Sequence, residues 1–200
     1  METQTNEGAL PDSRRYRLAF RLMTHQARTQ TISAMTSLSR HQQETLRRRW
    51  RITEETRRRG PSPTSLDRFT HSPRARAEGA SLAAICRIYG LIPLEDIVGA
   101  PRRKLLTLEL GERLCDTYET YRACFSRSEL EFEQLLSFVL GVAENEVIGL
   151  GRCISCSGTV LIDRLAPLRP TCAHCQRAGA ESLVVIPEAD SGDDPPLSKA

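Results

Sequence analysis

Two C-x2-C motifs near the C-terminal end constrain this 200-residue chain more than any other feature. Cys153 and Cys156 form the first pair, Cys172 and Cys175 form the second, and a fifteen-residue spacer separates them. A C-x2-C turn places two sulfurs on one side of a metal ion, and two such turns complete the tetrahedron of soft ligands that zinc prefers. The spacer can form a short hairpin, and its length lies within the range of four-cysteine zinc sites. The sequence therefore predicts one Zn2+ held by these four cysteines.

Two other interpretations of the four cysteines stay open at this level. Thiols can form a redox pair, and four thiolates also suit an iron–sulfur cluster. His174 lies inside the second motif and could replace one sulfur, although we expect it to be exposed or to support a ligand. Because four thiolates leave no open coordination position, the predicted ion is structural and contributes to the folding of its module.

The sequence does not predict an enzyme. The four histidines, at positions 25, 41, 71 and 174, are scattered. The chain also lacks the H-E-x-x-H motif of metalloproteases and the cysteine and histidine pattern of zinc deaminases. The remaining cysteines, Cys86, Cys115 and Cys124, lie in apolar stripes with helical spacing, so we expect them in the core.

No apolar run is long enough for a membrane helix, and the first residues lack the apolar stretch of a secretory signal. We therefore expect a cytoplasmic protein, where cysteines serve as thiols or metal ligands rather than as disulfides.

Charge is distributed unevenly along the chain. Residues 13–60 contain thirteen arginines, no lysine and three acidic residues, whereas residues 82–150 contain seven basic and eleven acidic residues. This imbalance favours an anionic partner at the N-terminal end, with nucleic acid as the leading candidate. Arginine forms bidentate contacts with phosphate and guanine, so the dense cluster predicts DNA contacts. The tentative DNA-binding residues are Arg40, Arg47, Arg48, Arg49 and Arg51. A solvated helix face, or one that binds acidic protein, is the alternative.

Hydrophobic spacing predicts a mainly α-helical fold with a small ribbon-like four-cysteine module. Residues 14–35 have helical spacing, with Asp12 or Ser13 as the possible cap, and a second helix follows a break at 37–39. Ser39 and Gln42 form a capping-box pattern that starts this second helix, which could complete a helix-turn-helix. Ser128 and Glu131 form another such pattern. The expected segments are a disordered leader (1–12), a basic helical region (13–58), a connector (59–80), a helical body (81–147), the zinc module (148–180) and a mostly disordered tail (181–200).

Three stretches of the sequence resemble the FlhC family, whose members are subunits of the bacterial flagellar master regulator. They are Leu22 to Gln30 with Leu38-Ser39-Arg40 and the basic helix through Trp50, then Arg59 to Pro63 leading to Asp67-Arg68-Phe69, and the cysteine motifs at 153–175. The resemblance covers about residues 14–178. The order of the cysteine module and the N-terminal segment makes it specific, because four-cysteine modules alone occur in many proteins.

This resemblance implies a DNA-binding transcriptional activator that forms a heterohexamer with a FlhD-like partner subunit. It also implies binding to promoter DNA of flagellar operons and recruitment of RNA polymerase. The family's metal-ligand role carries over to the four cysteines alone. An alternative function is a zinc-containing adaptor that binds other proteins without touching DNA, because zinc modules and helical stripes serve docking equally well.

Overall fold

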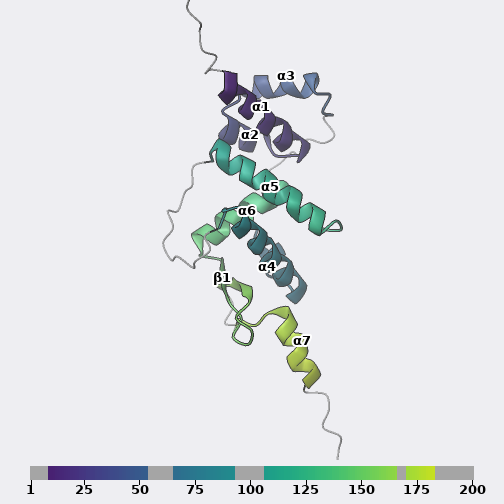
Figure 1. Cartoon of the computed structure of the whole chain (residues 1–200), viewed down its shortest axis with the longest axis vertical. Helices are drawn as coiled ribbons and strands as arrows, with labels where there is room; N and C mark the ends of the chain where they lie inside the picture. The colour runs from purple at the N-terminus through teal and green to yellow at the C-terminus, as the bar shows by residue number, and fades with distance from the viewer. Residues whose placement is uncertain (1–8, 54–64, 93–105, 166–169, 183–200) are drawn as a thin grey trace, which may run out of the picture.

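The chain folds into a mainly helical structure with a small β-hairpin near its C-terminal end, as the sequence predicted. The computed structural model describes residues 9–53, 65–92, 106–165 and 170–182. Within this part of the chain the elements stack along one long axis, with α1 and α3 at one end and α7 at the other (Figure 1). In order they are α1 (Ala9–Thr24), α2 (Thr29–Thr36), α3 (Arg40–Arg49), the 3-10 helix η2 (Asp67–Phe69), α4 (Pro73–Ile88), α5 (Leu108–Cys124), α6 (Phe132–Glu144), β1 (Ile148–Arg152), β2 (Thr159–Asp163) and α7 (Ala173–Ser182).

The N-terminal region contains three helices rather than two. The single helix expected over 14–35 is wrong, because Gln26 adopts a left-handed backbone with φ 59° that ends α1. Residues 27, 32 and 35 remain in the core even so, since α1 and α2 both bury apolar faces. Helix α1 also begins at Ala9, inside the segment expected to be a disordered leader and upstream of the caps proposed at Asp12 or Ser13.

The predicted capping box of α3 is confirmed. The backbone N–H of Gln42 donates to Ser39 Oγ at 3.3 Å, and the Gln42 side chain accepts from the backbone N–H of Ser39 at 2.8 Å. The turn from α2 to α3 is held by Gln43, a buried residue whose Nε2 donates to Ser33 Oγ at 2.7 Å and to the carbonyl of Leu38 at 3.1 Å. Helix α3 therefore has a fixed orientation relative to α2.

Helix α2 has no side-chain cap of its own, and a distant carboxylate from α6 fills that role. Glu133 is buried, and its carboxylate accepts the backbone N–H of Arg28 at 2.8 Å and the hydroxyl of Thr31 at 3.1 Å. A negative charge at the first turn of a helix also interacts favourably with the helix dipole. This contact ties the α2–α3 pair to the helical body.

We expect Glu133→Ala to lower the free energy of unfolding by about 1–3 kcal/mol, because it removes the acceptor of the buried Thr31 hydroxyl and of the partly buried Arg28 N–H. Urea denaturation followed by circular dichroism measures this change. Glu129→Ala is the matched control, since Glu129 is an exposed glutamate outside α6. Equal unfolding midpoints for the two variants would contradict the capping role of Glu133.

Charged side chains join α1 to α5. Arg14 donates to Glu112 at 2.7 Å, and Arg21 donates to Asp116 and Glu119 at 2.7 Å each. The hydrogen bond from Arg14 holds the pKa of Glu112 below its usual value. Burial acts to raise the pKa of Glu119, but hydrogen bonds from Arg21 and His25 outweigh it, so this pKa is also lowered. The acidic surplus of the helical body thus neutralises part of the N-terminal arginine surplus.

Two element starts differ from the sequence-based predictions. Helix α4 begins at Pro73, within the predicted connector 59–80, because Ser72 accepts the N–H of Ala75 at 3.1 Å and proline suits the first helical position. Residues 59–64 of that connector, and residues 54–58 of the basic region before it, lie outside the described residues. Helix α6 begins at Phe132, and its capping box pairs Glu131 with Gln134 instead of Ser128 with Glu131.

The β-hairpin packs directly on the helical body. Strands β1 and β2 pair antiparallel, with Ile148 opposite Asp163 and Arg152 opposite Thr159. A side chain added at Gly79 of α4 would meet Leu161 Cδ2 at 2.8 Å, so the helix and β2 approach closely. The hairpin therefore places the first cysteine pair relative to the helices. None of the described helices combines the length and the apolar character that crossing a membrane requires.

Candidate metal centre and basic surface

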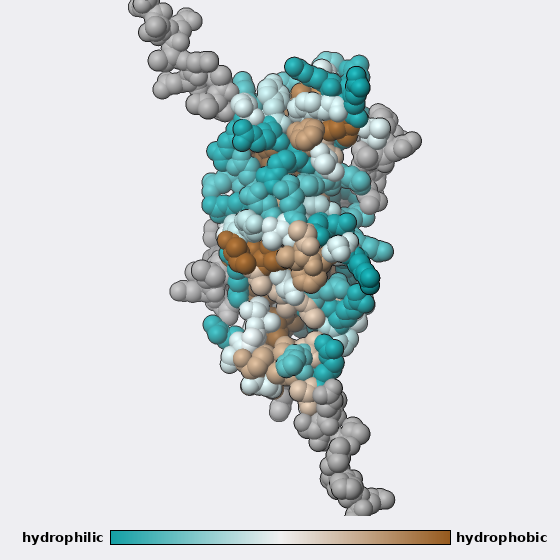
Figure 2. Space-filling view, turned by 45° about the vertical axis from the view of Figure 1, so that its right-hand side comes forward, coloured by the Kyte–Doolittle hydropathy of each residue, from teal (hydrophilic) through white to brown (hydrophobic). Residues whose placement is uncertain are grey.

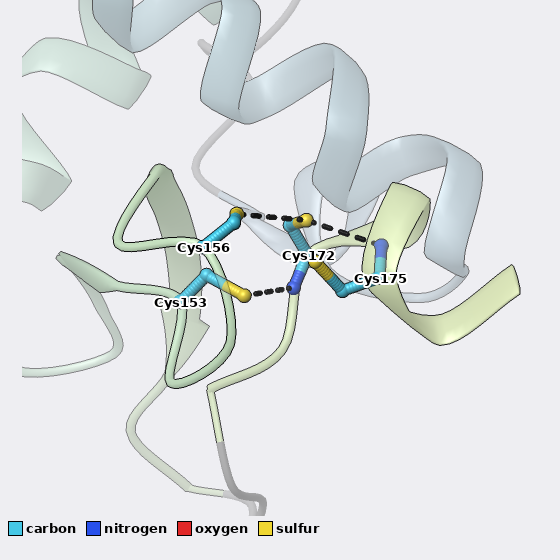
Figure 3. A group of neighbouring side chains, drawn as sticks. All are labelled: Cys153, Cys156, Cys172 and Cys175. Carbon is cyan, nitrogen blue, oxygen red and sulfur yellow. Dashed lines mark hydrogen bonds between the residues drawn. The ribbon is translucent and has the colours of Figure 1, made fainter. Parts of the chain in front are cut away.

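The first cysteine pair lies in the turn of the hairpin. Cys153 follows β1 directly, and its backbone N–H donates to the carbonyl of Gly158 at 2.8 Å. Ser157 closes the turn with φ 59° and donates its N–H to the carbonyl of Cys153 at 2.9 Å. This tight turn brings the side chains of Cys153 and Cys156 to the same end of the hairpin (Figure 3).

The second pair lies at the start of α7. Cys172 precedes the helix, and Cys175 lies in its first turn. The chain reaches this position beside the hairpin because the N–H of Ile154 donates to the carbonyl of Pro170 at 3.0 Å. Backbone amides also support the sulfurs, since Cys172 N–H donates to Cys153 Sγ at 3.3 Å and Cys175 N–H donates to Cys172 Sγ at 3.4 Å.

All four sulfurs converge on one point. They lie within 4.8 Å of one another, and the Sγ atoms of Cys156 and Cys172 are 3.7 Å apart. Four ligands at about 2.3 Å around a tetrahedral zinc ion are about 3.8 Å from each other. The spacing of the sulfurs therefore suits a metal ion, as the sequence predicted.

Neighbouring groups shift the pKa values of three of the four cysteines. Hydrogen bonds from the backbone amides of Cys172, Cys156 and Ser155 lower the pKa of Cys153 to about 6, and the amide of Cys175 lowers the pKa of Cys172. The neighbouring sulfurs, that of Cys172 first, raise the pKa of Cys175 to about 12. Closely spaced thiolates repel one another, and a divalent cation bound among them would stabilise all four in the deprotonated form.

The structure also locates the three cysteines outside the cluster and His174, whose surroundings were predicted from the sequence. Cys86 and Cys115 are buried, as predicted, and burial raises the pKa of each thiol to about 12. Cys124 is exposed, so its expected place in the core is wrong. It is the last residue of α5, and residues 122–124 at this end of the helix are all exposed. His174 is exposed, in agreement with the prediction.

The arginines proposed to bind DNA separate into two groups. Arg40, Arg48, Arg49 and Arg51 are exposed on α3 and just after it, and we call these four residues the α3 basic surface. Figure 2 shows mainly hydrophilic residues at this end of the molecule (top). Arg47 has only 8% of its surface exposed, because it follows buried Gln43 by one helical turn and faces the core with it. The prediction that Arg47 lies on an exposed, DNA-contacting surface is therefore wrong.

The structure also shows an aromatic patch that the sequence analysis did not identify. Tyr16 and Phe20 lie one turn apart on α1 and are 40% and 45% exposed. The ring of Phe20 meets Trp50 edge-on, with 5.3 Å between ring centroids. Trp50 packs against the core while only partly buried. The four-residue spacing of Tyr16 and Phe20 could have indicated this patch, but the same spacing is expected of residues on the apolar face that α1 buries.

No protein-family model and no curated protein matches the chain.

Proposed function

We propose that the four cysteines bind one structural Zn2+ ion, and that the chain is a DNA-binding transcription regulator. The convergence of the four sulfurs carries the first statement, since they are spaced as a tetrahedral ion requires. Their contacts with backbone amides give each pair a defined geometry. Because the four ligands leave no position for water or substrate, the ion acts in folding rather than in catalysis.

Iron is the main competing metal, because tetrahedral sulfur coordination suits both elements. X-ray absorption of the purified full chain distinguishes them. The proposal predicts a zinc edge with four sulfur neighbours at about 2.3 Å. An iron edge, or a shell containing nitrogen or oxygen atoms, would contradict the proposed ion or its ligands.

The α3 basic surface carries the proposal of DNA binding. Helices α2 and α3 are joined by the three residues 37–39, which is the connection length of a helix-turn-helix. In that motif the second helix enters the major groove, while neighbouring groups contact phosphates. Arg48 and Arg49 are exposed in the last turn of α3, and Arg51 extends the positive surface past the helix end. These positions fit phosphate and base contacts, and they contribute to the local excess of positive charge.

Charge reversal tests DNA binding. We expect the triple variant Arg48→Glu, Arg49→Glu and Arg51→Glu to weaken binding to a flagellar promoter duplex by about tenfold or more at 0.1 M salt. The slope of log affinity against log salt should also fall, by about one for each lost phosphate contact. Fluorescence anisotropy across a salt series, with and without a FlhD-like partner, measures both quantities.

Arg74→Glu is the control for this experiment, since Arg74 is an exposed arginine on α4, outside the α3 basic surface. It should leave the affinity and the slope nearly unchanged. Binding that is absent, or that does not respond to salt in any variant, would contradict DNA recognition by this surface.

The resemblance to FlhC proteins extends this proposal to a complex with a FlhD-like subunit, promoters of flagellar operons and recruitment of RNA polymerase. A docking adaptor without DNA contact is the second candidate, and the aromatic patch favours it. Exposed tyrosine, phenylalanine and tryptophan side chains are typical of protein interfaces. An adaptor would keep partner binding after reversal of the arginine charges, so the triple variant separates the two functions.

A further inference from the structure

The four cysteines of the cluster differ in their access to solvent. Cys153 is buried, Cys172 and Cys175 are partly exposed, and Cys156 is exposed. A side chain added at Gly158 would meet only Cys156 Sγ, at 3.4 Å, so the space beside this sulfur is open. A molecule the size of hydrogen peroxide can therefore approach Cys156 from solvent.

We propose that Cys156 is an oxidation site: a two-electron oxidant such as hydrogen peroxide attacks its sulfur first, Cys172 completes a disulfide with it, and the metal ion is released. This inference rests on the proposed zinc site. Oxidation of a cysteine depends on thiolate character and on exposure, and a nearby second cysteine directs the product to a disulfide.

Cys172 is placed to react with oxidised Cys156. Their sulfurs are 3.7 Å apart and face each other from the hairpin turn and the segment before α7 (Figure 3). A disulfide bond is about 2.05 Å long, so the two sulfurs must approach. The Cys156 side chain can rotate toward Cys172, because it is exposed and the space beside its sulfur is open. Cys153 is more constrained, since its N–H bonds to Gly158 and its sulfur accepts the N–H of Cys172.

The chemistry balances with peroxide as the only co-reactant. The Cys156 thiolate attacks one peroxide oxygen, so that an S–O bond forms, the O–O bond breaks, and the leaving hydroxide takes up a proton to give water. The Cys172 thiolate then attacks the Cys156 sulfur, so that an S–S bond forms, the S–O bond breaks, and a second water leaves after protonation. Two sulfurs lose two electrons, and peroxide gains them. The ion keeps two thiolate ligands, Cys153 and Cys175, which do not complete a tetrahedral shell.

The experiment follows zinc release from the full chain during treatment with hydrogen peroxide. A chromophoric zinc chelator reports release, and mass spectrometry of peptides maps the disulfide. The background carries Cys124→Ser, since Cys124 is exposed and would react independently. We expect zinc release together with a Cys156–Cys172 disulfide, and recovery of bound zinc after thiol reduction and addition of zinc.

Two histidine variants give a matched comparison, because three cysteines and one histidine also form a zinc site. Cys156→His removes the exposed sulfur, and we expect its zinc release to be at least about tenfold slower than in the background protein. Cys175→His removes a partly exposed sulfur outside the proposed pair, and its release should stay within about threefold of the background.

Each outcome supports or overturns the inference. Retention of zinc under peroxide, a disulfide between another pair, or equal protection in the two histidine variants would overturn it. If neither histidine variant holds zinc, the disulfide map of the background protein decides. Absence of zinc before any oxidant would instead overturn the proposed metal site, so the two failures are distinguishable.

Discussion

Replacement of Cys153 by serine should strip the metal ion from the chain and open the module that holds it. Cys153 is the buried cysteine of the cluster, its backbone N–H bonds to Gly158 within the hairpin turn, and its sulfur accepts the N–H of Cys172 from the second pair. Structural zinc contributes about 10–16 kcal/mol to the folding of small zinc modules at neutral pH. Loss of a group that hydrogen-bonds a metal ligand weakens metal binding by about 10–100-fold. Loss of one of the four ligands themselves should therefore weaken zinc binding by more than about a hundredfold.

Zinc per chain, measured by plasma mass spectrometry after dialysis against a chelator, tests this expectation. Limited proteolysis should then cut the variant between the two cysteine pairs, while α4 to α6 stay protected. Cys124→Ser is the matched control, because it makes the same change at an exposed cysteine outside the cluster. Unchanged zinc in the Cys153 variant, or equal loss in the control, would contradict the ligand assignment.

Phe138→Ala should produce the largest loss of stability in the helical body. Phe138 has none of its surface exposed, and its ring lies against Phe69 with 4.7 Å between centroids. It therefore connects α6 to η2 at the centre of the core. Truncation of a buried phenylalanine removes hydrophobic burial and leaves a cavity, which costs about 3–5 kcal/mol. Urea denaturation of zinc-loaded protein, followed by helical circular dichroism, measures the loss.

Phe20→Ala makes the same change at a phenylalanine that is 45% exposed. We expect a loss below about 1.5 kcal/mol, since half of its area already meets water and the main interaction removed is the edge contact with Trp50. If the two variants lose similar stability, the position of Phe138 in the core is wrong.

The elements that depend on local chemistry were the ones the sequence predicted best. Ser39 and Gln42 form their capping box because both partners lie within one helical turn, where no distant residue competes. The two cysteine pairs could also be recognised from the sequence, because the spacing of metal ligands within each pair is a local property. The spacer was expected to form a hairpin of its own between the pairs, and this was wrong: within its described residues it supplies only β2, and the partner strand β1 precedes Cys153.

The sequence-based predictions were wrong where more than one nearby group could form the same contact, or where a neighbouring side chain was unexpectedly buried. Ser128 could have capped α6, but Glu131 and Gln134 form the box instead, which moves the helix start to Phe132. Arg47 belongs to a dense arginine cluster, yet it lies one turn after Gln43, whose side chain is buried because it bonds to the α2–α3 turn. Spacing of apolar residues does not reveal a buried glutamine.

Long-range contacts account for the remaining features that the sequence did not predict. The carboxylate that caps α2 comes from Glu133, which is 105 residues away from Arg28 in the chain. Gly79 permits the close approach of α4 and β2, and this packing joins the cysteine module to the helices. No pattern within a single segment indicates such contacts, so sequence reasoning treated the module as a separate unit.

Native mass spectrometry of the full chain, purified under reducing conditions without added metal, measures most directly whether four sulfurs share one ion. The expected spectrum shows the folded chain heavier by a single zinc atom, less the protons displaced from the thiols, and acid should return it to the mass of the polypeptide alone. A folded chain at the mass of the bare polypeptide, with the hairpin and α7 still protected from proteolysis, would contradict the account.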